Sequence, residues 1–434
     1  MAIKERLLRE LFAIENRLTH TSDVTDRVAK NSILQQLTII RDLCCDGLPK
    51  EHWGNYVEIY DGMILAFKQM SKIESEAERA EIRSLIVDIL QKLVQQTKNE
   101  NNFKKEIVFL PYKASMWDSL ESVWQAATED TEHCKAYVMP IPYADRNPDG
   151  SAAAWHYEGA EFPQNVPVLD CNKIDLNEMR PDMIFIHNCY DANNLVTSVD
   201  ERFYSTNLKN CTDKLVYIPY FVLGEIDPDN EEVVKGIQHF VLTPGVLNSD
   251  LVIVQSEKMR EAYINVLIKN TNVSDRAFWE KRILGLGSPK LDKVAHAERK
   301  DFRLPKAWKK LLKGKKAVLY NTSLSSMLKY TENYCKKIRS VLATFKKQKD
   351  IVLWWRPHPL MEATFRSMHP ELLKEYEKIV KDYKKAGWGI FDDTAELTRS
   401  IVWTDGYYGD WSSVVQLYEA TGKTIMIQNV ESYE

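Results

Sequence analysis

Long hydrophobic runs and CxxC motifs are both missing from this chain of 434 residues. No apolar stretch reaches the roughly eighteen residues of a membrane-spanning helix, so the sequence predicts none. The N-terminus also lacks the apolar core of a signal peptide. The seven cysteines are scattered and form no CxxC pair, which argues against a zinc site and favours a cytoplasmic protein with reduced thiols.

A strong charge of either sign is missing as well. The formal net charge is -4, which argues against a general nucleic-acid binder. Hydrophobic residues make up 44% and charged residues 28% of the chain, as is usual for globular proteins. The length is sufficient for two or three domains with full cores.

Residues 1–98 have the apolar spacing of amphipathic helices. Apolar side chains recur every three or four positions within Leu7–Leu18, Ile33–Leu43 and Ile82–Leu93. Gly47 and Pro49 indicate a break between helices. We expect a helical bundle that packs on the main body or forms a homo-oligomer. A membrane-surface role is the weaker alternative, because no basic face accompanies the apolar one.

From Lys104 onward, short apolar strands alternate with helical or loop segments. Such alternation predicts βαβ units and parallel sheets. We therefore expect an α/β fold with two Rossmann-like domains (104–275 and 276–434) facing each other across a cleft. The polar, aromatic segment Arg146–Pro167 is predicted to be a long loop. The expected strands are Glu106–Pro111, Ala136–Ile141, Met183–His187, Leu215–Pro219, Leu251–Val254, Lys316–Asn321 and Thr424–Ile427.

An Arg-Pro-His-Pro turn follows a strand of the buried type. Asp350–Trp355 is almost continuously apolar, as a parallel strand covered on both faces would be. The turn Arg356–Pro359 then presents an arginine and a histidine, which are suited to phosphate oxygens. A strand-end cap by His358 and a surface ion pair of Arg356 are the structural alternatives.

A second motif, Asp-Trp-Ser-Ser at Asp410–Ser413, comes about fifty residues later. The sequence predicts a strand over Ser400–Asp405, a glycine-containing loop, the motif, and a helix over Val414–Thr421. Two serines at a helix N-terminus suit a phosphate group, because free backbone N–H groups point there. Simple helix capping is the alternative. Ligands of open α/β sheets bind at the carboxyl ends of strands, where both motifs are expected.

On this strand frame, the two motifs resemble those of the CDP-glycerol glycerophosphotransferases, the teichoic-acid primases and polymerases of the GT-B architecture. The resemblance covers roughly residues 245–434, is much weaker over 105–245 and is absent over 1–98. Three further segments are similar to family patterns, namely Asn248–Ser256, Arg282–Asp292 and Lys316–Thr322.

The resemblance implies transfer of glycerol phosphate, or equally ribitol phosphate, from CDP-glycerol or CDP-ribitol to a hydroxyl, with release of CMP. The implied acceptor is a polyol phosphate or glycan, with a lipid-linked form and a peripheral place at the inner membrane face left open. His358 would neutralise the leaving oxygen, and Asp410 would orient the His358 ring or the glycerol hydroxyls. The implied donor-binding residues are Arg356, Ser412, Ser413, Gly287, Ser288, Asn321 and Thr322.

The chain departs from the family where the general base is expected. Family members carry a Trp-His-Gly-Thr-Pro segment, whereas the corresponding Leu215–Gly224 has no histidine. We expect another base, with His187 the catalytic candidate beside Asp191, Glu225 and Asp118, and with Tyr220 and Lys113 lining the cleft. Gly406–Gly409 is an insertion relative to the family, and the family continues beyond the position of Glu434, so a fragment or a different domain closure is expected.

Two alternative functions remain. A nucleotide-sugar glycosyltransferase of the same fold would leave both phosphates on the nucleoside. An inactive module would bind a CDP-alditol without turnover, which the missing histidine favours. The two motifs lack an acidic pair, so we expect neither a metal nor a cofactor, and Asp392-Asp393 is predicted to be a solvated turn.

Overall fold

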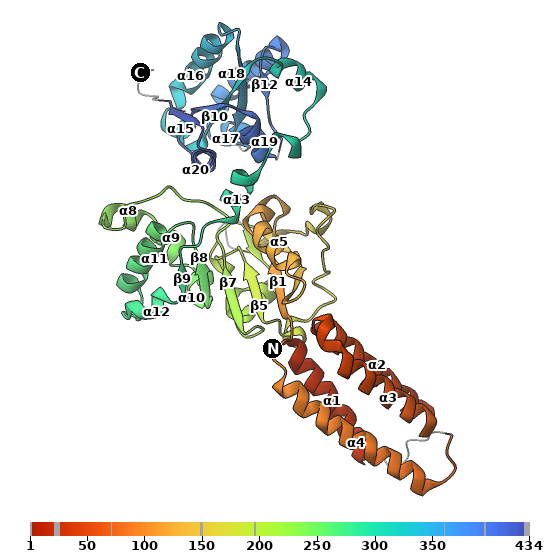
Figure 1. Ribbon diagram of the computed structural model, residues 1–434. Helices are drawn as coiled ribbons and strands as arrows, with labels where there is room; N and C mark the ends of the chain where they lie inside the picture. Colours follow the sequence, from red (N-terminus) through yellow and green to blue (C-terminus); the bar gives the residue numbers. More distant parts are fainter. Residues whose placement is uncertain are drawn as a thin grey trace. The chain divides into compact units, whose positions relative to one another are not determined.

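The computed structural model describes residues 2–20, 27–70, 72–147, 151–194, 197–359, 361–394 and 396–428 (Figure 1). The chain forms two compact units. The N-terminal unit comprises Met1–Ile218, Ile237–Val252 and Val266–Leu284, and the C-terminal unit comprises Pro219–Gly236, Ile253–Asn265 and Gly285–Glu434. Each unit contains a parallel sheet with helices, so the expected α/β class with two Rossmann-like sheets is confirmed.

The expected N-terminal bundle is present and consists of α1 (Ala2–His20), α2 (Arg27–Gly47), α3 (Trp53–Met70) and α4 (Glu76–Asn99). Each helix packs on the next, and α4 returns to α1 (Figure 1). None of the described helices is both long and apolar enough to cross a membrane. The apolar stripes face one another in a single core, as their spacing predicts. The core includes Leu7, Leu11, Ile14, Leu37, Ile40, Tyr60, Phe67, Ile86 and Leu90.

Polar contacts join the bundle to the sheet that follows it, among them an ion pair between Lys135 on β2 and Asp46 on α2 at 3.2 Å. The guanidinium of Arg6 on α1 lies 2.9 Å from the carboxylate of Glu106 on β1, and the Glu106 side chain is almost fully buried. The backbone N–H of Lys104 donates to the carbonyl of Gly47 over 2.8 Å. The homo-oligomer surface expected on these helices stays a prediction.

A six-stranded parallel sheet follows the bundle in the chain, in the order β2-β1-β5-β7-β8-β9. Its central strands are nearly all apolar, because helices cover both faces of a parallel sheet. The strands are β1 (Lys105–Leu110), β2 (Cys134–Val138), β5 (Met183–Ile186), β7 (Lys214–Tyr217), β8 (Leu251–Ile253) and β9 (Ile283–Leu284). The helices up to β9 are η1 (Lys50–His52), η2 (Ala114–Ser119), α5 (Glu121–Glu129), η3 (Gly159–Glu161), α6 (Leu176–Met179), η4 (Asp191–Asn193), η5 (Glu201–Phe203), α7 (Ser205–Leu208), α8 (Glu231–Gly236), α9 (Gln238–Val241), α10 (Pro244–Asn248), α11 (Glu257–Asn270) and α12 (Arg276–Glu280).

A small antiparallel sheet corrects the loop predicted at Arg146–Pro167. Strand β4 (Ala152–His156) lies within that segment and pairs with β3 (Tyr143–Arg146), which pairs in turn with β6 (Thr197–Val199). The prediction was wrong because the strand is short, exposed and alanine-rich, so it lacks the apolar alternation that identifies strands. Residues 148–150 of the segment lie outside the described residues.

The C-terminal unit holds a five-stranded parallel sheet in the order β12-β11-β10-β13-β14. Its strands are β10 (Lys316–Thr322), β11 (Ile351–Pro357), β12 (Ile390–Phe391), β13 (Gly406–Gly409) and β14 (Thr424–Ile427). The helices are α13 (Pro289–His296), η6 (Arg299–Asp301), α14 (Lys306–Leu312), α15 (Leu324–Lys329), α16 (Thr331–Lys346), α17 (Met361–Met368), α18 (Pro370–Ala386), α19 (Leu397–Trp403) and α20 (Ser413–Glu419). Trp354 and Trp355 of β11 are fully buried, one in each of two cores.

The strand predicted at Ser400–Asp405 is wrong. Most of that segment belongs to α19, and the strand is instead Gly406–Gly409, which the sequence had presented as a loop insertion. A short apolar run cannot be assigned to helix or strand by periodicity alone, and in this protein the run forms the buried helix α19. Gly409 is required at its position, because a Cβ there would collide with the carbonyl oxygen of Asn321 on β10.

Each sheet has one point where the chain reverses its direction of winding. In the first sheet β2 lies on one side of β1 and β5 on the other. In the second sheet β11 lies on one side of β10 and β13 on the other. The carboxyl ends of strands at such a switch point form the usual ligand crevice of open α/β sheets. A ligand-binding site is therefore expected at the switch point of each sheet.

Candidate functional site

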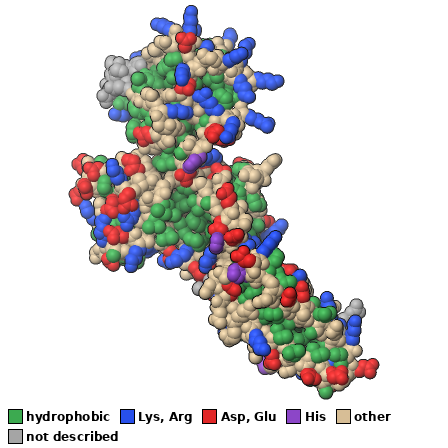
Figure 2. Space-filling model, viewed as in Figure 1, with side chains coloured by type: hydrophobic (Ala, Val, Ile, Leu, Met, Phe, Trp, Pro, Cys, Tyr) green, Lys and Arg blue, Asp and Glu red, His purple; other side chains and the backbone are tan. Residues whose placement is uncertain are grey.

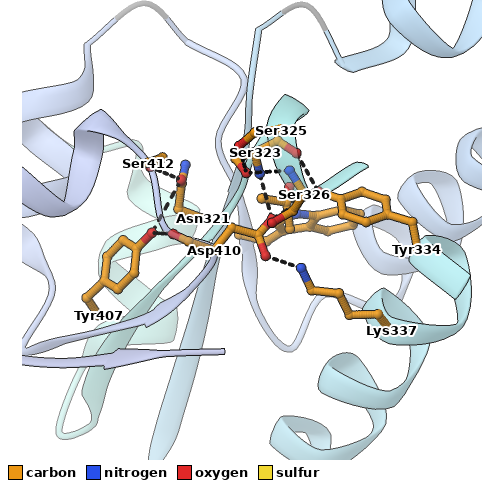
Figure 3. A network of polar contacts seen from close by, with 11 residues as sticks. Asn321, Ser323, Ser325, Ser326, Tyr334, Lys337, Tyr407, Asp410 and Ser412 are labelled. Atoms are coloured by element: carbon orange, nitrogen blue, oxygen red, sulfur yellow. Dashed lines mark hydrogen bonds and ion pairs between the residues drawn. The ribbon is translucent and has the colours of Figure 1, made fainter. Parts of the chain in front are cut away.

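Asn321, the penultimate residue of β10, joins the two predicted motifs at the switch point of the C-terminal sheet (Figure 3). Its Nδ2 donates to the carbonyl of Arg356 over 3.1 Å, and its Oδ1 accepts from the hydroxyl of Ser412 over 3.0 Å. The backbone N–H of Asp410 donates to its carbonyl over 3.0 Å. The structure thus brings both motifs to one sheet edge, but the side chain of Asn321 is used within the protein.

Asp410 is buried and bound on both carboxylate oxygens. One oxygen accepts from the ammonium of Lys337 on α16, and both side chains are fully buried. The other accepts from the backbone N–H of Ser323 over 2.7 Å and from the Tyr334 hydroxyl over 3.2 Å (Figure 3). A carboxylate so enclosed positions the loop after β10 and cannot also orient a ligand hydroxyl.

Lys337 is a site residue that the sequence analysis missed. Burial lowers the pKa of Lys337, and the charge of Asp410 opposes that shift. Its position does carry a signal, because it lies three residues after Tyr334 and four before Val341, both buried on the same face of α16. A lysine in an apolar stripe requires a buried partner, and the motif carboxylate is the one present.

The serines of the second motif differ in exposure. Ser412 is the N-cap of α20, and its Oγ accepts from the Val414 N–H over 3.3 Å while donating to Asn321. Ser413 is exposed. Trp411, between Asp410 and Ser412, is 56% exposed, whereas tryptophan side chains are on average largely buried. Ser413 and Trp411 are therefore the motif side chains most accessible to a ligand.

Arg356 is held by the protein and is not a surface ion-pair residue. Its Nη2 donates to the carbonyl of Thr394 over 2.6 Å, and its Nη1 lies 3.1 Å from the carboxylate of Asp392 without hydrogen-bond alignment. Asp392 is fully buried and also pairs with Arg399 and the indole N–H of Trp354. The prediction of a solvated Asp392-Asp393 turn was therefore wrong for Asp392.

His358 directly follows β11 and lines a cavity of about 470 Å³ in the C-terminal unit. Its backbone N–H donates to the carbonyl of Thr322 over 2.9 Å. Burial lowers the pKa of the half-buried His358 ring, so the imidazole is mostly neutral at pH 7 before a ligand binds. An anionic ligand would favour the charged form. The other lining residues include Met361, Glu362, Val380, Lys381, Lys384, Phe391 and Asp393.

The side chains or backbone groups of the remaining predicted donor residues make contacts within the protein. The Oγ1 of Thr322 is fully buried and accepts from the Trp355 indole N–H over 3.2 Å. Gly287 has φ +111°, which favours glycine, and its N–H donates to the Val254 carbonyl. Ser288 is the buried N-cap residue of α13, a helix that packs on α19 and α20.

His187, at the carboxyl end of β5, is fully buried, which argues against its predicted role as a base. Its Nε2 accepts from the backbone N–H of Tyr112 over 3.0 Å, and its Nδ1 lies 2.8 Å from the Ser119 hydroxyl. Because Nε2 is an acceptor, Nδ1 carries the hydrogen of the neutral ring. His187 thus ties the loop after β1 to β5.

The other predicted bases are distributed over both units. Asp191 is buried and accepts from the N–H and hydroxyl of Ser205, so it is structural. Burial raises the pKa of Asp191. Glu225, in the C-terminal unit with Tyr220, accepts from Gln255 and Ser256. Asp118 is half-buried in η2. Among the described residues, no three His, Cys, Asp or Glu side chains are placed to hold a metal ion.

No protein-family model matches this chain, and no curated protein matches it either. Solved structures similar to it include the wall teichoic acid polymerase TagF soaked with CDPG, with 14% identity over 86% of this chain and 80% of that one, and a TM-score of 0.39. UDP-GlcNAc 2-epimerases of Neisseria meningitidis and Methanocaldococcus jannaschii have 11% and 9% identity and TM-scores of 0.42 and 0.43. They match 75% and 74% of this chain and 83% of their own length each. Similarity this low carries no functional argument.

Proposed function

We propose that this protein transfers an alditol phosphate, with glycerol phosphate preferred, from a CDP-alditol to a hydroxyl of a polyol-phosphate or glycan acceptor and releases CMP. The observation that carries the proposal is the junction of the two motifs through Asn321 at the switch point of the C-terminal sheet. Such crevices bind phosphate-containing ligands in many open α/β sheets. The chemistry needs little more than positioning and charge stabilisation.

In this proposal His358 supports the departure of CMP. Its ring borders the cavity of about 470 Å³, which is within the usual range of ligand pockets. The apolar side chains of Met361 and Val380 provide a surface for a nucleotide base or ribose, and Lys381 provides positive charge. The Lys384 ammonium lies 3.0 Å from the Asp393 carboxylate, which also lines the cavity. The neutral ring of His358 becomes protonated beside the diphosphate and then stabilises the leaving oxygen.

The second motif supplies the phosphate contacts. The exposed Ser413 hydroxyl would bind the phosphoryl oxygens, while Ser412 and Asp410 hold the segment in place. Arg356 shapes the turn through Thr394 and Asp392 and does not contact the donor in this proposal. The roles of Arg356 and Asp410 are thus positioning roles, unlike the direct roles that the resemblance implies.

The charge distribution supports an anionic donor in the C-terminal unit. The unit contains 30 Lys and Arg against 25 Asp and Glu, a net charge of +5, although the whole chain carries -4. Figure 2 shows Lys and Arg side chains gathered on the visible face of this unit. A positive field raises the local concentration of a nucleoside diphosphate and its rate of association.

Incubation of the purified protein with CDP-glycerol, CDP-ribitol and UDP-glucose, followed by separation of the nucleotides, tests the proposal. We expect CMP from a CDP-alditol and no UDP. Release of UDP would identify a glycosyltransferase instead. Tight binding of CDP-glycerol with no CMP, after an acceptor screen that includes polyol phosphates and glycans, would identify a binding module.

A further inference from the structure

We propose that the N-terminal unit carries its own binding site for a hydroxyl-rich acceptor on the β3–β4 hairpin, and that His156 accepts the proton of the attacking hydroxyl. This inference rests on the proposed function, and it assigns chemistry to a side chain that no motif identified. The chemistry is assigned to one hydrogen-bonded pair, His156 and Asp145.

The site lies at the switch point of the first sheet, at the carboxyl ends of β1 and β5. The loop after β1 is held there by His187, whose Nε2 accepts from the Tyr112 N–H. The Tyr112 ring packs edge-on against His187, with 5.2 Å between ring centroids, and against Tyr143 of β3, with 5.5 Å. All three rings are buried beside the carboxyl ends of these strands.

Glu158 fixes the hairpin beside these rings. One of its carboxylate oxygens accepts from the Ala114 N–H in the loop after β1 over 2.7 Å. The other accepts from the Tyr143 hydroxyl over 2.6 Å. Both strands of the hairpin are therefore attached to the crevice, and their side chains lie at the end of the sheet where ligands bind.

His156 and Asp145 form a partly exposed pair on this hairpin. Tyr143 and His156 are direct cross-strand partners, and Asp145 lies two residues further along the same face of β3. The His156 ring stacks on Tyr143, with 5.0 Å between centroids, and its Nε2 lies 2.7 Å from the Asp145 carboxylate. The two side chains retain 40% and 51% exposure, so solvent and ligand can reach them.

The hydrogen bond to Asp145 selects the tautomer that a base requires. A carboxylate only accepts hydrogen bonds, so Nε2 of His156 carries the hydrogen and Nδ1 carries the lone pair. Asp145 is thus a positioning residue and His156 the proton acceptor.

The neighbouring groups suit a polyol or sugar hydroxyl compound. The Lys113 ammonium lies 4.7 Å from the centre of the Tyr143 ring, where it can donate to hydroxyl or phosphate oxygens. In the reaction, the acceptor O–H gives its proton to Nδ1 while its oxygen bonds to the alditol phosphorus. The bond from that phosphorus to CMP breaks, and CMP keeps the electron pair.

The chain offers a matched control for this pair. His133 lies 2.8 Å from Asp130 in the turn that precedes β2, at the amino end of the same sheet, and its side chain is 76% exposed. It has the same partner type and is in the same unit, but it is away from the switch point. His133→Gln should therefore leave binding and transfer unchanged.

Binding is tested first by NMR of the full chain with labelled histidine rings, using His156→Gln and His133→Gln to assign the signals. Addition of glycerol 1-phosphate should shift the His156 signal and leave the His133 signal in place. An unmoved His156 signal, or equal movement of both signals, would overturn the acceptor site. This result does not depend on whether CMP is ever released.

Transfer is tested second, with CDP-glycerol as donor and glycerol 1-phosphate as acceptor. His156→Gln should lower kcat by about 10²–10⁴-fold, as for a lost general base, with donor affinity unchanged. Asp145→Ala should lower kcat with little change in the acceptor KM, and Asp145→Glu should recover part of it. Normal kcat in His156→Gln would overturn the assignment. Absence of CMP with wild type would refute the proposed function, and the NMR result would still decide the acceptor site.

Discussion

The two switch-point crevices occupy equivalent places in their sheets but are built in opposite ways. In the C-terminal unit, the crevice rests on a fully buried ion pair, and the polar side chains of Asn321 and Asp410 are bound to other protein groups. In the N-terminal unit, the His156–Asp145 pair is about half exposed above buried aromatic rings. A rigid crevice suits a donor whose phosphates must be placed accurately. An accessible pair suits an acceptor that arrives and exchanges its proton with water.

The largest expected effect concerns the ligand-facing side of the rigid crevice. His358→Ala should lower turnover of CDP-glycerol by about 10²–10⁴-fold, because the charge on departing CMP loses its stabilising imidazole. CMP release measures this change, and His296→Ala, an exposed histidine on α13, is the control. Near-normal turnover of His358→Ala would remove that residue from the mechanism.

The buried ion pair can be broken from either side. Asp410→Asn leaves the Lys337 ammonium without a charged partner and should destabilise the protein by about 3–5 kcal/mol. Urea-induced unfolding followed by tryptophan fluorescence measures the loss. The double variant Lys337→Met with Asp410→Asn should recover part of the stability. If the losses of the two single variants simply add, the two side chains are not coupled as proposed.

The Arg6–Glu106 pair provides a pH-dependent contrast, because Arg6 is partly exposed and Glu106 is not. Burial raises the pKa of Glu106, and Arg6 opposes that shift. A raised carboxyl pKa costs stability as the pH rises above the ordinary value of about 4.3. Arg6→Ala should therefore destabilise little in acid but by about 1–3 kcal/mol at neutral pH.

Thermal unfolding of Arg6→Ala across this pH range gives the measurement. The double variant with Glu106→Gln should be far less sensitive to pH, since the titrating group is gone. A loss in Arg6→Ala that is the same at acid and neutral pH would contradict the account of Glu106.

The smallest effect separates the two serines of the second motif. Ser412→Ala removes a helix cap and the contact with Asn321, and should cost about 1 kcal/mol of stability. Ser413→Ala should leave stability unchanged but weaken binding of CDP-glycerol, measured by calorimetry. Equal effects of both variants on stability and binding would contradict the separate roles of Ser412 in structure and Ser413 in ligand binding.

Periodicity predicted much of this fold. The four N-terminal helices, most strands of both sheets and the position of the two motifs at strand ends all follow from spacing and apolar runs. The main failure, at Ser400–Asp405, arose because six apolar and polar residues fit a buried helix as well as a strand. Tertiary packing decides such segments, and packing is not visible in a short window of sequence.

The candidate site was harder to predict because its chemistry depends on burial. Arg356 was expected to bind the donor and Asp410 to orient the glycerol hydroxyls or His358, yet both are enclosed by protein partners. Lys337 could have been found as a lysine on an apolar face, whereas His156 carried no signal in a segment predicted to be a loop. Which polar side chain remains accessible is a property of the folded chain and not of its local pattern.

The buried ion pair also orders events in time. The Asp410 carboxylate accepts hydrogen bonds from Ser323, Tyr334 and Lys337. All three residues precede Asp410 by more than seventy positions in the chain. Until β13 inserts beside β10, α16 carries an ammonium with no counter-charge against its apolar face. The C-terminal crevice is therefore complete only after β13 has paired with β10, because its ion pair closes a loop of 73 residues.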